Sequence, residues 1–210
     1  EVKRRIYDTF PTQNRAVTQE DYENLAYRMP AKYGSIKRCS VQRDPDSQKR
    51  NLNMYIVSED SFGKLILSSD AIKNNLKVWL NQHRMINDTV DIIDPFIINI
   101  GVNFVVSSKQ GVNKFDLLER CVALIGSKFG QPFYIGEDIN ISEMYQEIAK
   151  INGVHEVINV KLVGKNGSNY SGNSININQN LSPDGTKLVI PRNAIVEIKF
   201  PDVDIKGQVR

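Results

Sequence analysis

The stretch "FIINIGVNFVVSS", residues 96–108, constrains the fold of this chain more than any other part of the sequence. Its even-numbered positions from 98 to 106 are all large and apolar: Ile98, Ile100, Val102, Phe104 and Val106. Side chains two residues apart lie on the same face of a β-strand, so the pattern predicts a long strand with one buried face. A sheet with one buried face requires a covering layer, for which the helices predicted nearby are the candidates.

Four segments have apolar residues at helical spacing, and each has a polar residue at its expected N-terminus. Asn113 is the predicted cap of the third helix, whose expected apolar stripe is Phe115, Leu118, Val122, Ile125 and Phe129. The fourth is expected to start at Ser142 and to end at Gly153 in a left-handed C-cap. The four predicted helices occupy 18–29, the segment after the serines at 68–69, 113–130 and 142–153.

The first helix, predicted at 18–29, has the most complete start signal. Thr18 is a good N-cap, and Asp21 lies three residues later in the capping-box position. Val17 and Tyr22 occupy the positions of a hydrophobic staple, and Pro30 stops the helix. The stretch is therefore predicted to be the start of a domain core.

Alternating strands complete the predicted order, which is α-β-β-α-β up to Pro95 and β-α-α-β-β after it. Helices that interrupt short strands without a steady βαβ alternation indicate an α+β fold. We expect two small open-faced α/β sandwich-like units, 1–95 and 96–210, with Pro95 as a hinge between them. The Gly/Asn/Ser-rich segment 164–187 is predicted to be a surface loop or a protruding, loosely ordered hairpin.

Composition and charge exclude several classes of protein. The longest apolar runs are about half the length that spans a bilayer, and no signal-peptide pattern is present. Residues 1–50 hold 11 Lys/Arg against 7 Asp/Glu, and residues 51–210 hold 16 against 17. This mildly basic first fifth, with Lys3 to Arg5, keeps nucleic-acid binding as an alternative. Cys39 and Cys121 lie in apolar-patterned segments and are predicted to be buried free thiols.

A search for catalytic or binding motifs finds no strong site. "GKNGSNYSG" lacks the spacing of a phosphate-binding loop, and neither histidine, His83 or His155, follows a nucleophile motif. Three Asp pairs beside prolines are better explained as turn residues than as acid/base or metal sites: Asp44/Asp46, Asp91/Asp94 and Asp202/Asp204. The first helix could present N–H groups to an anion near Arg15, but Thr18 and Asp21 are expected to satisfy them. No cofactor, no metal and no catalytic residues are predicted.

"NRAVTQEDYENLA", Asn14 to Ala26, resembles the signature segment of the baseplate J family of contractile-tailed bacteriophages and related injection machines. The resemblance extends in element order from about Phe10 to about Gly164. The closing "IPRNAIVEIKFPDVDIKG" is similar to the larger baseplate wedge subunit of T-even-type phages, whereas the polar segment 164–187 is longer than the family pattern.

The resemblance implies a non-enzymatic virion protein of the viral tail. Such subunits form the inner ring of the baseplate, and they join wedges around the hub. The implied partners are copies of itself, expected as a dimer within a ring, and other baseplate wedge proteins, with neither a membrane nor nucleic acid expected. Because the sequence starts at Glu1 without a methionine, we expect it to be the C-terminal part of a longer subunit.

Two other hypotheses remain open from the sequence. A nucleic-acid-binding module would use the basic N-terminal fifth, and its binding would fall steeply with salt. A hydrolase would act through His83 or His155, and alanine substitution of both would abolish its activity.

Overall fold

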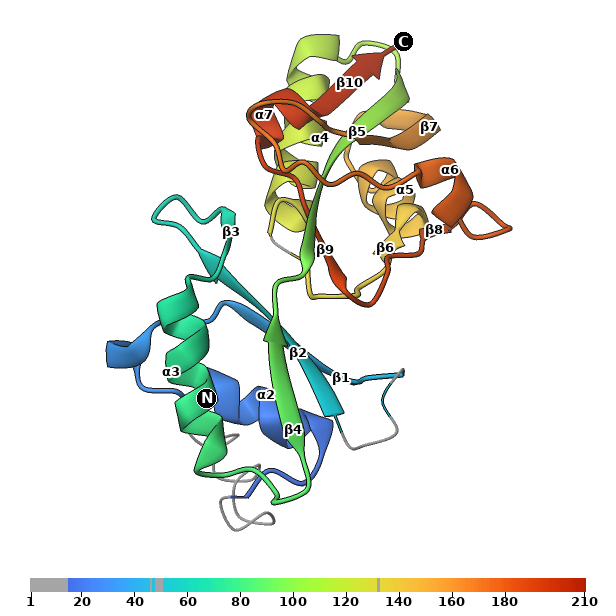
Figure 1. Cartoon of the computed structure of the whole chain (residues 1–210). Helices are drawn as coiled ribbons and strands as arrows, with labels where there is room; N and C mark the ends of the chain where they lie inside the picture. Colours follow the sequence, from blue (N-terminus) through green and yellow to red (C-terminus); the bar gives the residue numbers. More distant parts are fainter. Residues whose placement is uncertain (1–14, 46, 48–50, 132) are drawn as a thin grey trace. The chain divides into compact units, whose positions relative to one another are not determined.

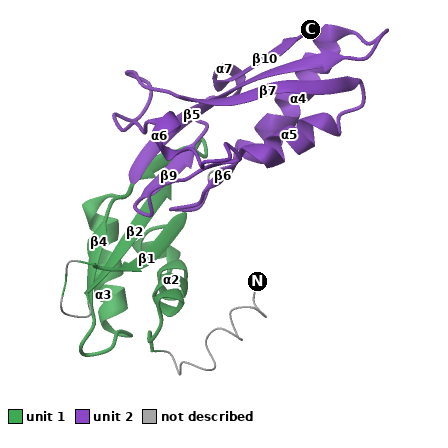
Figure 2. Cartoon of the chain, turned by 90° about the vertical axis from the view of Figure 1, so that its right-hand side faces the viewer, with its two compact units in different colours: residues 1–95 green, residues 96–210 purple. Residues whose placement is uncertain are grey.

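The computed structural model describes residues 15–45, 47, 51–131 and 133–210 (Figure 1). The chain divides into two compact units, residues 1–95 and 96–210 (Figure 2). Each unit has helices packed on an open sheet, and the sheets do not close into barrels. The predicted α+β class is therefore confirmed.

Unit 1 is built around one central strand, β2. This strand pairs antiparallel with β1 and β3, and parallel with β4. β3 was not predicted, because a strand of three residues is too short to show an alternating pattern. The elements in chain order are α2 (Gln19–Tyr27), the 3-10 turn η1 (Ala31–Tyr33), β1 (Arg38–Arg43), β2 (Asn51–Glu59), β3 (Leu65–Leu67), α3 (Asp70–Asn81) and β4 (Thr89–Ile93).

Helix α2 begins with the predicted capping box. The Thr18 hydroxyl accepts a hydrogen bond from the Asp21 N–H at 3.2 Å, and the Asp21 carboxylate accepts from the Thr18 N–H at 2.9 Å. The predicted staple is wrong, because Val17 is 49% exposed while Tyr22 is fully buried. Ala16 is buried instead, with its N–H donating to the His83 carbonyl at 2.9 Å. Because the backbone is extended at Thr18, neighbouring side chains point in opposite directions, and Val17 faces solvent while Ala16 faces the core.

The core of unit 1 lies between the two helices and one face of the sheet. The alternation predicted for β1 and β2 buries Cys39, Val41, Met54 and Ile56. Helix α3 begins at the predicted serines, since Ser69 caps it by accepting from the Ile72 N–H. Helix α2 ends at Tyr27, three residues before Pro30. The other buried members are Tyr22, Leu25 and Ala26 from α2, Met29 just after it, Leu76 and Leu80 from α3, and Val90 from β4.

Unit 2 is built around the long strand β5. This strand pairs antiparallel with β7 and parallel with β9 and β10, and a separate two-stranded sheet joins β6 to β8. The predicted order β-α-α-β-β omitted the shortest elements and the closing strand. The elements are β5 (Phe96–Ser108), α4 (Lys114–Phe129), β6 (Ile139–Asn140), α5 (Ile141–Ala149), β7 (Val154–Gly164), α6 (Ile177–Asn180), β8 (Lys187–Leu188), β9 (Ala194–Glu197), α7 (Pro201–Asp204) and β10 (Ile205–Val209).

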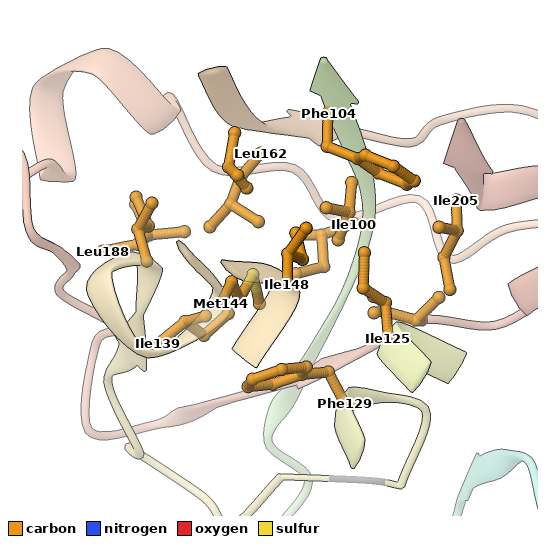
Figure 3. Close-up of a cluster of buried hydrophobic side chains, with 14 of the residues drawn as sticks. Ile100, Phe104, Ile125, Phe129, Ile139, Met144, Ile148, Leu162, Leu188 and Ile205 are labelled. Atoms are coloured by element: carbon orange, nitrogen blue, oxygen red, sulfur yellow. The ribbon is translucent and has the colours of Figure 1, made fainter. Parts of the chain in front are cut away.

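The predicted buried face of β5 forms the centre of the unit 2 core. All five even-numbered residues from Ile98 to Val106 are buried. Helices α4 and α5 cover that face, and Ile125, Phe129, Met144 and Ile148 meet it (Figure 3). Figure 2 shows the two helices on the same side of the sheet of β10, β5 and β7.

The predicted boundaries and stripes of the helices in unit 2 need correction. Asn113 caps α4 as expected, but Phe115 is 84% exposed, and the buried stripe is Leu117, Cys121, Ile125 and Phe129. The buried residues are spaced four apart, so they form one row along the helix. The packing of α4 on the sheet decides which row is buried, and Phe115 lies outside that row despite its large apolar side chain. Helix α5 runs from Ile141 to Ala149, so it begins before Ser142 and ends before Gly153. Gly153 adopts φ 106° in the turn before β7.

Candidate assembly surfaces

The two histidines lie in different units. The His83 ring packs edge-on against Trp79, with ring centroids 4.9 Å apart, at the end of α3. His155 is exposed near the start of β7.

The Asp pairs separate into individual roles. Asp44 follows β1, where its N–H donates to the Asn51 carbonyl at 3.0 Å, and Asp46 lies outside the described residues. Asp94 forms an ion pair with Lys73 at 2.6 Å, while Asp91 is exposed on β4. Asp44 and Asp94 directly follow strands, as expected of strand-end residues, whereas Asp91 lies in the middle of β4.

Both cysteines are buried and free, as predicted. Burial raises the pKa of the Cys39 thiol and that of the Cys121 thiol, so both are held as the unreactive protonated form. Among the described residues, no group of three or more His, Cys, Asp or Glu side chains is arranged to hold a metal ion.

The start of helix α2 and the basic first fifth offer no described anion site. The Asp21 carboxylate accepts from the N–H groups of both Val17 and Thr18, so the helix start has its own anion. Arg15 is exposed, and Lys3 to Arg5 lie outside the described residues. In the described ranges no helix is long and apolar enough to cross a membrane.

The outer edge of β1 is closed by side chains from α2. The Cys39 N–H donates to the Tyr27 hydroxyl, and the Val41 N–H donates to the Glu23 carboxylate, each at 2.8 Å. Burial raises the pKa of Glu23 despite the favourable bond from Val41, and burial also raises the pKa of Tyr27 to about 12. An edge whose N–H groups are satisfied in this way does not pair readily with another strand.

Strand β9, which lies in the stretch "NAIVEIKF", is engaged within unit 2. All four of its residues are buried, and it pairs in parallel with β5 from Phe96 to Asn99. The Gly136 N–H donates to the Ala194 carbonyl at 2.8 Å. Partner pairing along this strand is therefore not supported.

The polar segment 164–187 is mostly exposed or half-buried, and hydrogen bonds anchor it to β5. It contains α6 and begins β8, and it is held against β5 at both backbone and side-chain level. The Lys165 N–H donates to the Asn99 carbonyl at 2.9 Å, and the Ser171 N–H donates to the Asn99 side chain at 2.7 Å. The Asn99 amide in turn donates to Glu197 at 3.3 Å, and both of these side chains are buried.

A second anchor for this segment is the fully buried carboxylate of Asp204. It accepts from the Tyr170 hydroxyl at 2.6 Å and from the Phe200 N–H at 2.9 Å, and Lys165 lies 3.4 Å away. The bond to Asp204 raises the pKa of Tyr170 to about 12. Asp204 was predicted to be a turn residue, and the bond from Phe200 agrees, but its long-range partners were not predicted.

Two further features lie at the surface formed by the described residues of unit 1. The turn between β2 and β3 exposes Phe62 to 83%. A pocket of about 450 Å³ opens where the core meets the start of α2, and it is lined by Val17, Thr18, Gln19, Arg43, Leu52 and Asp88. The phenylalanine in the otherwise polar turn "EDSFGK" was the sequence signal for the first feature, whereas the pocket has no sequence signal.

The fold thus defines a two-unit α+β protein whose polar groups are used mainly for architecture. No protein-family model matches the chain, and no curated protein matches its sequence. Among solved structures, it is similar to a chain of the cryo-EM structure of the anti-feeding prophage (AFP) baseplate, 6-fold symmetrised. The TM-score is 0.56 at 12% identity, over 90% of this chain and 39% of that chain. The fold is shared, and this chain spans about two fifths of the length of its neighbour.

A buried tyrosine gives unit 1 a predicted sensitivity to alkaline pH. Burial, together with the bond to Asp88 at 2.9 Å, raises the pKa of Tyr22 from its ordinary value near 10 to about 12. The stability that this group contributes is complete below pH 10 and is lost as pH rises to 12, because the unfolded chain ionises first.

We therefore expect the unfolding free energy of the unchanged protein to fall by about 2 kcal/mol more than that of Tyr22→Phe between pH 10 and 12. At pH 8 the variant should be less stable by about 1–3 kcal/mol, because a buried carboxylate loses a donor. Urea denaturation across this pH range measures both quantities. Parallel pH profiles for the two proteins would contradict the assignment.

Proposed function

We propose that this chain is a non-enzymatic structural subunit of the baseplate of a contractile tail or a related injection machine. The observation that carries the proposal is the fold shared with a prophage baseplate chain over 90% of this chain. The described polar and titratable groups agree with it, because they close a strand edge, cap helices and anchor a long segment. The finer role is a wedge subunit that forms the inner ring by contacts with its own copies and with other wedge proteins.

Electron microscopy of contractile particles tests the proposal directly. Antibodies raised against the purified chain should label the baseplate end of tails made by the cells that encode it. Label that is absent from the tails, while the protein is abundant in the same cells, would contradict the proposal. The nucleic-acid alternative predicts DNA retention at low salt that falls steeply as salt rises, and negligible retention would remove it.

A further inference from the structure

The chain has three steps at which an asparagine or an aspartate directly precedes a glycine. They are Asn152–Gly153, Asn166–Gly167 and Asp184–Gly185. At such a step the backbone nitrogen of the glycine can attack the side-chain carbonyl carbon of the residue before it. Glycine favours the attack because it has no Cβ atom to crowd its nitrogen and because its backbone turns freely. Whether a step reacts then depends on how firmly the fold holds the groups involved.

The Asn166–Gly167 step is held least. Both residues are exposed, within the segment 164–187. No described residue forms a hydrogen bond with the Asn166 side chain, the Asn166 carbonyl or the Gly167 N–H. The bond from the Tyr170 N–H to the Gly167 carbonyl, at 3.1 Å, belongs to the following peptide group. The peptide plane that joins the two residues can therefore turn without breaking a hydrogen bond to the described part of the chain.

The Asn152–Gly153 step is fixed in the turn before β7. The Arg120 guanidinium donates to the Asn152 carbonyl at 3.1 Å, and the Lys109 N–H donates to the Gly153 carbonyl at 2.9 Å. Gly153 is buried, and a Cβ atom there would lie 3.1 Å from the nearest side chain. Turning the peptide plane of this step breaks the bond from Arg120, so the attack requires a local opening of the turn first.

Hydrogen bonds occupy both reacting groups of the Asp184–Gly185 step. The Gly185 N–H donates to the Ser182 carbonyl at 2.8 Å. The Asp184 carboxylate accepts from the Ser182 hydroxyl and from the hydroxyl and N–H of Thr186. These bonds, that from Ser182 above all, lower the pKa of Asp184 to about 2, so the group is ionised at neutral pH. An ionised carboxylate repels an incoming nucleophile and has no ready leaving group.

We propose that Asn166 is a site of spontaneous deamidation and that the fold protects the other two steps. The Gly167 nitrogen gives its proton to a solvent base and bonds to the Asn166 Cγ atom. The Cγ–Nδ2 bond breaks, and Nδ2 takes up a proton and leaves as ammonia. Water then opens the resulting succinimide ring: cleavage of the new N–Cγ bond leaves aspartate, and cleavage of the original peptide bond leaves isoaspartate. The reaction consumes water and needs no other reagent, so it is independent of the proposed function.

The modification would change a segment that is anchored on both sides of Asn166. Lys165 and Tyr170 both contact the Asp204 carboxylate, at 3.4 Å and 2.6 Å, and Asn166 lies between them in the chain. Either product places a carboxylate next to Lys165. Isoaspartate also lengthens the backbone, because the chain then runs through the side-chain carbon. Deamidation at Asn166 would therefore alter both the charge and the backbone of this segment after folding.

The test incubates the full chain for increasing times at mildly alkaline pH, both folded and denatured in guanidinium chloride. Digestion after lysine releases residues 151–161 and 166–187 as separate peptides, so each Asn-Gly step can be followed on its own. Tandem mass spectrometry locates the conversion of an amide to an acid, and chromatography separates the isoaspartyl forms. Asn166→Gln is the matched control, because the longer side chain would have to form a larger ring. Circular dichroism verifies that this variant folds.

In the folded protein we expect Asn166 to convert at least about tenfold faster than Asn152, because the turn at Asn152 must open before it reacts. In guanidinium chloride the two rates should become similar, and in Asn166→Gln the peptide 166–187 should stay unchanged over the same period. Similar rates for Asn166 and Asn152 in the folded protein would overturn the proposal. Conversion of the peptide in Asn166→Gln at the original rate would do so too, as would isoaspartate formed as fast at Asp184 as at Asn166.

Discussion

Replacing Asp204 by alanine is expected to lower the free energy of unfolding by about 3–5 kcal/mol. The carboxylate is fully buried, and it is the acceptor for the Tyr170 hydroxyl and the Phe200 N–H, with Lys165 as its ion partner. The Lys165 side chain keeps only 19% of its surface exposed, so most of an uncompensated charge would remain buried. Removing one partner of such a pair costs far more than the pair itself contributes.

Urea denaturation gives the loss of stability, and hydrogen exchange shows where it acts. Exchange should accelerate in the segment 165–187, because Tyr170 and Lys165 belong to it. Asp202→Ala is the matched control in the same helix α7, since Asp202 is exposed, and it should stay within about 0.5 kcal/mol of the unchanged protein. A loss below about 1 kcal/mol for Asp204→Ala would mean that the carboxylate does not anchor the segment.

Gly207→Ala should cost about 2–3 kcal/mol, the second largest effect of a single change. A Cβ atom at this position would lie 2.3 Å from the Phe104 Cζ atom and 2.5 Å from the Leu118 Cδ1 atom. Gly207 is the register partner of Phe104 in the β10–β5 pair, and the Phe104 ring is 1% exposed. A close-packed interior accommodates such a methyl group only by displacing side chains from their preferred rotamers.

The contribution of the clash can be measured by replacing the Phe104 ring with the smaller side chain of leucine. Phe104→Leu alone should also lower the free energy of unfolding. The double variant Phe104→Leu with Gly207→Ala should lose about 1 kcal/mol less than the two single variants lose together. Gly172→Ala serves as the control, because a Cβ there has no atom within 4 Å. Additive losses in the urea denaturation of these variants would show that the ring is not what Gly207 makes room for.

Local signals in the sequence identified the starts of three helices and the long strand β5. Thr18, Ser69 and Asn113 cap helices because a short polar side chain can reach the free N–H groups of the first turn. The alternation of β5 was equally readable, because a strand buried on one face must repeat every two residues. Both signals depend only on residues within a few positions of one another.

The errors have a different origin. β3, β6 and β8 contain two or three residues each, too few for a period to appear. Phe115 fits an apolar stripe, yet it is exposed, because the rotation of α4 is set by its packing on the sheet. Val17 was assigned to a staple, but the buried position next to the cap is occupied by Ala16.

By itself the sequence determined the α+β class, the caps of three helices, the buried face of β5 and the burial of both cysteines. The tertiary structure decided what the polar residues do. Tyr170 reaches a carboxylate 34 residues away, and Ser171 reaches Asn99 over 72 residues, so no local pattern could reveal that segment 164–187 is anchored. The pocket beside Arg43 could not be predicted either, because the residues that line it come from separate parts of the sequence and are brought together only by folding.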